Sequence, residues 1–95
     1  MHIVWSPQSL RDLRTIREYI AKDSELYADL SIARIFSAVE RLAQFPHSGR
    51  IVPERDEAGI REIIVGRFRL VYRVQGTAIQ IATIFRASRE FPERL

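Results

Sequence analysis

Five arginines in the second half of the chain have the residue type and spacing expected of an anion-binding site. They are Arg61, Arg69, Arg73, Arg86 and Arg89. A guanidinium presents its N–H donors in a planar fork that matches the oxygens of phosphate or carboxylate. The apolar stretch VGRFRLVYRV, residues 65–74, holds three arginines and no acidic residue. Because crowded like charges repel one another, this pattern favours binding of an external anion.

Cleavage of RNA through its own 2′-hydroxyl would use such cations to stabilise the charge of the transition state. That reaction also needs a general acid and a general base. Arginine remains protonated in proteins, and we expect Tyr72 to be packed in the core. His2 and His47 form no Ser-His-Asp set and no metal site with neighbouring carboxylates. The residues therefore provide stabilising cations without a proton-transfer pair, and no metal or cofactor is expected.

Composition predicts a single domain spanning residues 1–95. The chain has no cysteine, so neither disulfides nor thiolate metal ligands are expected. Its start has no secretory signal pattern and no long apolar run, which favours a cytoplasmic protein. Residues 1–49 carry six basic and six acidic side chains, and residues 50–95 carry nine and six. The whole excess of +3 therefore lies in the second half, where a solubility role is the alternative to a binding role.

Two helices are predicted between the first strand and the remaining strands. Ser6 is placed as an N-cap with Pro7 at the first helical position. Apolar residues then recur every three or four positions, which indicates one buried helix face. A second helix begins at Asp23 or Ser24 and ends before Pro46, because proline disfavours a helical residue before it.

Four segments have strand character, namely residues 2–5, 60–65, 68–74 and 77–85. Residues 50–59 are predicted to be a polar connection. The order β-α-α-β-β-β predicts an α+β fold with both helices packed on one face of a small antiparallel sheet.

Alternation along residues 68–74 directs Phe68, Leu70, Tyr72 and Val74 toward the helices. Arg69, Val71 and Arg73 then occupy the opposite, open face. Arg86 and Arg89, just after the last strand, are expected to join them, and Arg61 joins them if the hairpin register allows. The alternative is that Glu54, Glu62 or Glu90 of the same chain pairs with these arginines.

The chain resembles the RelE/ParE superfamily of bacterial type II toxins over nearly its whole length. The similar segments are WSPQSLRDLRTIREYI, FPHSGR, GIREIIVGRFRLVYRV and IFRASRE. The resemblance implies a single-domain toxin with two helices on a sheet. It also implies a cognate antitoxin whose partly disordered segment wraps the toxin, giving a hetero-oligomer. An acidic, amphipathic segment would suit the helical surface and the arginines.

The superfamily contains two activities. RelE-like members are ribosome-dependent mRNA endonucleases, and Arg69 and Arg89 match two of their arginine positions. However, Glu62 stands where those enzymes have a basic residue, and the ending EFPERL has no tyrosine. ParE-like members inhibit DNA gyrase, and the segments GRIVPE and GIREIIVGRFRLVYRV are more similar to theirs. The sequence thus favours a gyrase inhibitor. The alternatives are a ribosome-dependent endonuclease that cuts mRNA and a non-toxic structural or nucleic-acid-binding module.

Overall fold

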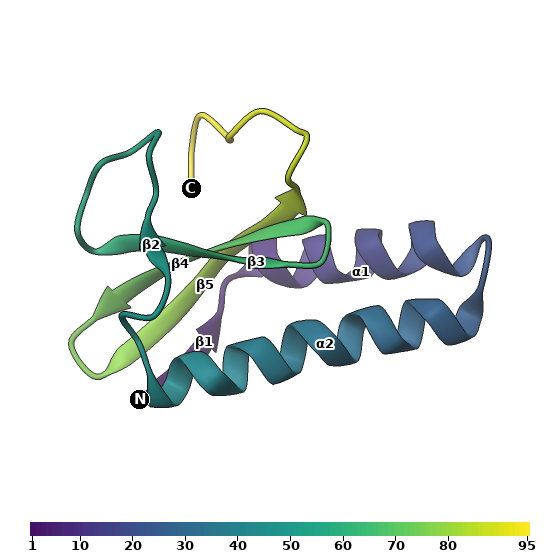
Figure 1. Cartoon of the computed structure of the whole chain (residues 1–95), viewed down its shortest axis with the longest axis horizontal. Helices are drawn as coiled ribbons and strands as arrows, with labels where there is room; N and C mark the ends of the chain where they lie inside the picture. The colour runs from purple at the N-terminus through teal and green to yellow at the C-terminus, as the bar shows by residue number, and fades with distance from the viewer.

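Two helices and five strands make up the computed structural model, which describes residues 1–95 (Figure 1). In chain order they are β1 (His2–Trp5), α1 (Pro7–Ala21), α2 (Glu25–Gln44), β2 (Arg50–Ile51), β3 (Ile60–Val65), β4 (Phe68–Gln75) and β5 (Ala78–Arg86). The α+β prediction is confirmed, with one more strand than expected. The added strand is β2, which lies in the segment expected to be only a connection.

Both helices begin at the serines that the sequence indicated. The Ser6 hydroxyl accepts a hydrogen bond from Ser9 N, and the Ser24 hydroxyl accepts one from Tyr27 N, each at 3.0 Å. These bonds satisfy backbone donors that have no partner within the helix. α2 ends at Gln44, directly before the Phe45–Pro46 pair.

The strands form one mixed sheet in the order β1-β5-β4-β3-β2. β1 runs parallel to β5, and all other neighbours are antiparallel. The sheet therefore differs from the wholly antiparallel arrangement expected. Since β4 pairs with one edge of β5, β1 pairs with the other edge. The hairpin of α1 and α2 then connects β1 to β2. No helix is both long enough and apolar enough to cross a membrane.

The main core lies between the helices and the sheet. Leu70 and Tyr72 of β4 are fully buried there against Ile35, Val39 and Leu42 of α2. Phe68 and Val74 also pack against this core. The predicted direction of these β4 side chains is confirmed.

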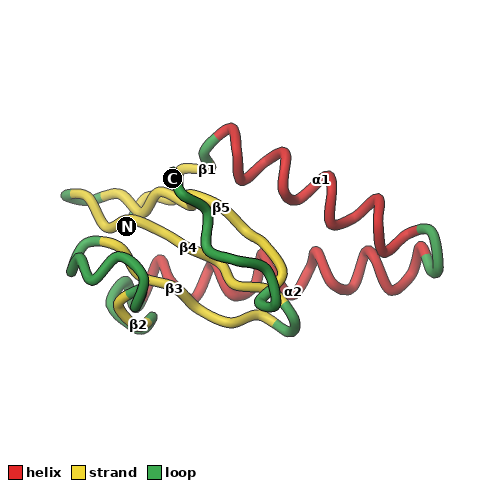
Figure 2. Tube along the Cα trace, turned by 90° about the horizontal axis from the view of Figure 1, so that it is seen from above, coloured by secondary structure: helices red, strands yellow, loops and turns green.

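The other face of the sheet is covered rather than open. A smaller apolar cluster lies there, formed by Val52, Ile60, Val71, Ala82 and Phe85. Phe91 and Leu95 of the C-terminal segment pack against it, and this segment runs across the sheet on the side away from the helices (Figures 1 and 2). The expectation of a bare second face is therefore corrected, because the chain folds two of its own segments over it.

Candidate functional site

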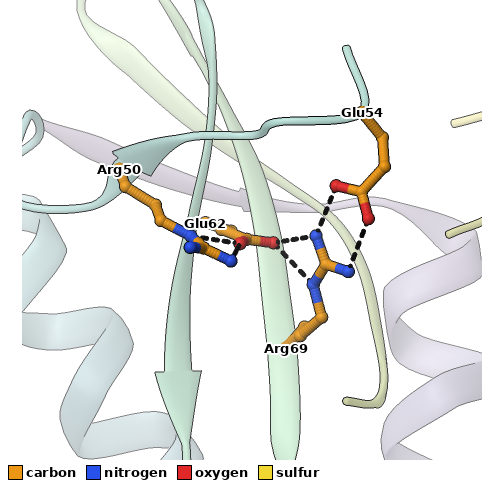
Figure 3. A network of polar contacts seen from close by, with 4 residues as sticks. All are labelled: Arg50, Glu54, Glu62 and Arg69. Atoms are coloured by element: carbon orange, nitrogen blue, oxygen red, sulfur yellow. Dashed lines mark hydrogen bonds and ion pairs between the residues drawn. The ribbon is translucent and has the colours of Figure 1, made fainter. Parts of the chain in front are cut away.

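Arg69 lies in the middle of the sheet and contacts two carboxylates of its own chain (Figure 3). Its Nη1 and Nη2 atoms donate to the two oxygens of Glu54 at 2.9 and 2.8 Å. Its Nε atom donates to Oε1 of Glu62 at 2.7 Å. Glu54 comes from the β2–β3 loop and Glu62 from β3, so Arg69 joins three parts of the chain.

Glu62 is the buried centre of this group, with a side chain that is fully shielded from solvent. Its second oxygen accepts a hydrogen bond from Arg50 Nε at 2.6 Å. Two guanidiniums and two carboxylates therefore form one neutral network, here called the ion-pair cluster (Arg50, Glu54, Glu62 and Arg69). The cluster supplies the polar partners that buried charged groups need.

Aromatic rings complete the enclosure of Arg69. Its guanidinium carbon lies 5.4 Å from the centre of the Phe85 ring and 5.3 Å from that of Phe91. Only 8% of the residue is exposed. The hydrogen bonds that Arg69 donates to the Glu54 carboxylate raise the pKa of Arg69 and lower the pKa of Glu54 to about 2. The prediction that Arg69 offers a free cation to a partner is corrected, since its charge is already matched within the chain.

Arg61 lies on the opposite face from Arg69. It is paired with Tyr72 in the sheet register, so its side chain extends on the helix side. Its Nη1 atom donates to Gly49 O at 2.8 Å, while its buried Nε has no partner. Arg61 therefore holds the end of the α2–β2 connection, and its placement with the other predicted arginines is corrected.

Arg73 keeps the predicted orientation, on the same face as Arg69. In register it stands between Ile60 of β3 and Gln80 of β5. It is half-buried and makes no ion pair with any carboxylate. The charge of Arg73 is therefore not matched by a carboxylate of its own chain.

Arg86 and Arg89 are exposed at the end of β5 and just after it. Arg86 pairs with Phe68 in register, and its guanidinium lies 5.2 Å from the centre of the Tyr19 ring on α1. Both arginines line a hollow of about 190 Å³ beside α1. The five predicted arginines thus occupy three different environments instead of one cluster, and Arg69 is the only one of them with a partner of opposite charge.

The alternative that Glu54 or Glu62 pairs with the arginines is confirmed for Arg69. The member of the ion-pair cluster that sequence reasoning missed is Arg50, which lies in a segment expected to be only a connection. The available signal was alternation, which puts Ile60 and Glu62 on one face of β3. Without the register between β3 and β4, that pattern did not reveal that Glu62 lies on the face of Arg69.

Comparisons with known proteins agree with this architecture. The family described as "ParE toxin of type II toxin-antitoxin system, parDE" matches residues 3–91. Among curated proteins, the chain is 33% identical over 88 residues to "Toxin RelE2" of Caulobacter vibrioides, covering 92% of this chain and 96% of that protein. It is 35% identical over 95 residues to "Putative toxin Y4kP" of Sinorhizobium fredii, covering 98% and 95% of the two chains.

A solved structure titled "Chromosomal ParDE TA system from P. aeruginosa" shares the fold, with a TM-score of 0.75 and 27% identity. The match covers 90% of this chain and 95% of that one. The fold and these relatives define a toxin of a type II toxin-antitoxin system. Within the RelE/ParE superfamily, the chain belongs to the ParE toxin family. Membership of a ParDE system implies a cognate antitoxin as its partner.

Proposed function

We propose that this toxin inhibits DNA gyrase in the cytoplasm until its cognate antitoxin binds and neutralises it in a hetero-oligomer. The observation that carries the proposal is the match to the ParE family over residues 3–91. ParE-like members of the superfamily are the gyrase inhibitors. The proposal requires no bound cofactor and no bond-breaking step by the toxin itself.

The chemistry of the site favours gyrase inhibition over mRNA cleavage. Arg69 is one of two arginines that match nuclease positions, and its guanidinium is held by Glu54 and Glu62 under the Phe91 ring. Arg89 is exposed but has no partner identified as a general acid or base. Stabilisation of a phosphoryl transition state needs donors aimed at the reacting group, and Arg69 is aimed at carboxylates.

Arg86 and Arg89 are the proposed contacts to the target, with Arg73 as a further contact from the sheet. All three lack an ion-pair partner, and Arg86 and Arg89 are exposed. Arg61 and Arg69, by contrast, are proposed to support the fold from within. Exposed arginines suit a target that offers carboxylates or phosphates, because their donors are free.

A supercoiling assay with purified toxin, gyrase and relaxed plasmid tests the proposal. We expect the toxin to block supercoiling or to trap cleaved DNA. The double variant Arg86→Gln and Arg89→Gln should need about tenfold more protein for the same inhibition, because two charge contacts are lost. The matched control is Arg11→Gln with Arg14→Gln, which removes the same charge from the exposed side of α1 and should keep full potency.

Intact gyrase activity at saturating wild-type toxin would refute the proposal. Primer extension on translated mRNA provides the decisive contrast. New 5′ ends that appear within codons only when toxin and ribosomes are both present would identify the nuclease instead.

A further inference from the structure

Residues 53–58 of the β2–β3 loop are hydrogen-bonded to the rest of the sheet through one side chain. Their backbone hydrogen bonds run only to Val52 and Ile60, where the loop begins and ends. Among their side chains, only Glu54 bonds to another element, and it accepts both of its hydrogen bonds from Arg69 of β4. The position of the loop over the sheet therefore depends on a single carboxylate.

Glu54 occupies the outer edge of the Arg69 guanidinium. Its two oxygens accept from Nη1 and Nη2 at 2.9 and 2.8 Å, which is bidentate geometry. The buried Glu62 occupies another edge, at Nε (Figure 3). The rings of Phe85 and Phe91 lie against the same guanidinium. A ligand can therefore approach from the side of Glu54, whose side chain is 43% exposed.

The charges of the ion-pair cluster leave room for one anion at this edge. Arg50, Glu62 and Arg69 together carry two positive charges and one negative charge, so without Glu54 they have a net charge of +1. A carboxylate with one negative charge restores neutrality and matches the planar fork of the guanidinium. A phosphate group carries about 1.5 to 2 negative charges at pH 7, which would leave excess negative charge beside the buried Glu62. The edge therefore favours a carboxylate.

We propose that the outer edge of Arg69 is a binding site for a free carboxylate, and that Glu54 is its displaceable internal occupant. When the carboxylate of a small organic acid binds there, Glu54 is released to solvent and residues 53–58 move away from β4. Glu62 stays in place, because breaking its contacts would leave a buried charge unpaired. The inference concerns a small ligand, goes beyond the proposed function and does not depend on gyrase being the target.

Thermal unfolding of Glu54→Ala in sodium formate tests the inference, with sodium chloride at the same ionic strength as the reference. At about 0.3 M, formate should raise the Tm of this variant by about 3–6 °C more than that of wild type, for a dissociation constant of about 0.1 M. Glu54→Gln fills the same place with an uncharged amide and should show no such excess. Glu57→Ala is the matched control, because it removes an exposed loop carboxylate that pairs only with Arg55.

Equal formate shifts in Glu54→Ala and Glu57→Ala would overturn the inference, because formate would then act on the protein as a whole. An equal shift in Glu54→Gln would also overturn it, since the amide blocks the outer edge of Arg69. A larger shift with phosphate than with formate would refute a site for carboxylates.

Limited trypsin digestion of the wild-type chain measures the release of Glu54 directly. Arg55 follows Glu54 in the loop, so release of the loop exposes the peptide bond after it to the protease. We expect formate to raise the rate of cleavage after Arg55 about twofold over chloride, because the ligand shifts the loop toward its released state. The rate is normalised to cleavage of an unstructured peptide under the same conditions. An unchanged normalised rate would refute displacement of Glu54.

Discussion

The Arg69 guanidinium touches two carboxylates and two aromatic rings of its own chain. Buried ion pairs of this kind add little net stability compared with apolar packing, but removing one member leaves an uncompensated charge. Glu62 is the member with no solvent access, whereas the Glu54 side chain is 43% exposed. Removing the buried Glu62 carboxylate should therefore cost more unfolding free energy than removing the partly exposed Glu54 carboxylate.

Glu54→Gln tests the outer contact of the cluster through its pH dependence. Arg69 lowers the pKa of Glu54 from 4.5 to about 2, so the folded state favours the ionised carboxylate. The resulting stability is present above the unfolded-state pKa and is lost as pH falls from about 4.5 toward about 2. We expect the variant to lose about 1 kcal/mol at neutral pH, since solvent screens the pair.

Urea unfolding of wild type and Glu54→Gln at about pH 7, 4 and 3 gives the required comparison. The difference in unfolding free energy should shrink as the pH is lowered. Glu18→Gln is the control, because Glu18 is exposed and makes no ion pair. A difference that stays constant down to pH 3 would contradict the assigned contact.

At the scale of elements, a single tyrosine fastens the α2–β2 connection to the sheet. The Tyr72 hydroxyl donates to Pro46 O at 2.8 Å and accepts from Gly49 N at 3.0 Å. Burial raises the pKa of this hydroxyl. Arg61 holds the same loop by donating to Gly49 O. Both the N–H and the C=O of Gly49 are therefore hydrogen-bonded to side chains of the sheet. These two bonds attach the α2–β2 connection to β3 and β4.

Gly49→Ala should loosen this attachment. An added Cβ would lie 2.5 Å from Glu62 O and 2.6 Å from the Tyr72 hydroxyl, so the loop or the sheet must move. We expect a loss of about 1–3 kcal/mol in unfolding free energy, as overpacking in a core commonly costs. Gly59→Ala is the matched control, because its Cβ would meet only Val74 O at 3.9 Å. Equal midpoints of denaturation for the two variants would disprove the close approach at Gly49.

Local patterns predicted the elements well but not their neighbours. Ser6, Pro7 and Ser24 identified both helix starts because caps act within one turn. Alternation predicted which side of β4 each residue faces. The pairing of Glu62 with Arg69 and the position of Phe91 over it depend on register and on the path of the C-terminal segment. These long-range relations are set by packing, so the sequence pattern alone did not reveal that the second face is covered.

At the scale of the whole molecule, the ion pairs determine which side chains carry the unpaired net charge. Residues 50–95 contain nine arginines and six acidic residues. Three of these arginines pair with three glutamates, through the ion-pair cluster and the Arg55–Glu57 pair. Six arginines therefore remain against three acidic residues, and the excess of +3 lies entirely on side chains outside ion pairs. Three of these six arginines, Arg67, Arg86 and Arg89, are exposed at the β3–β4 turn, at the end of β5 and just after β5.

Salt should therefore control how fast the toxin meets gyrase, its proposed target. Exposed charges act over about 10 Å at 0.1 M salt and over less distance as salt rises. With gyrase on a sensor surface, we expect the association rate to fall several-fold between about 50 and 200 mM salt, with little change in dissociation. The variant Arg86→Gln with Arg89→Gln should show a shallower salt dependence than the Arg11→Gln and Arg14→Gln control. If both variants show the same salt dependence, the association rate depends on overall charge and not on Arg86 and Arg89 in particular.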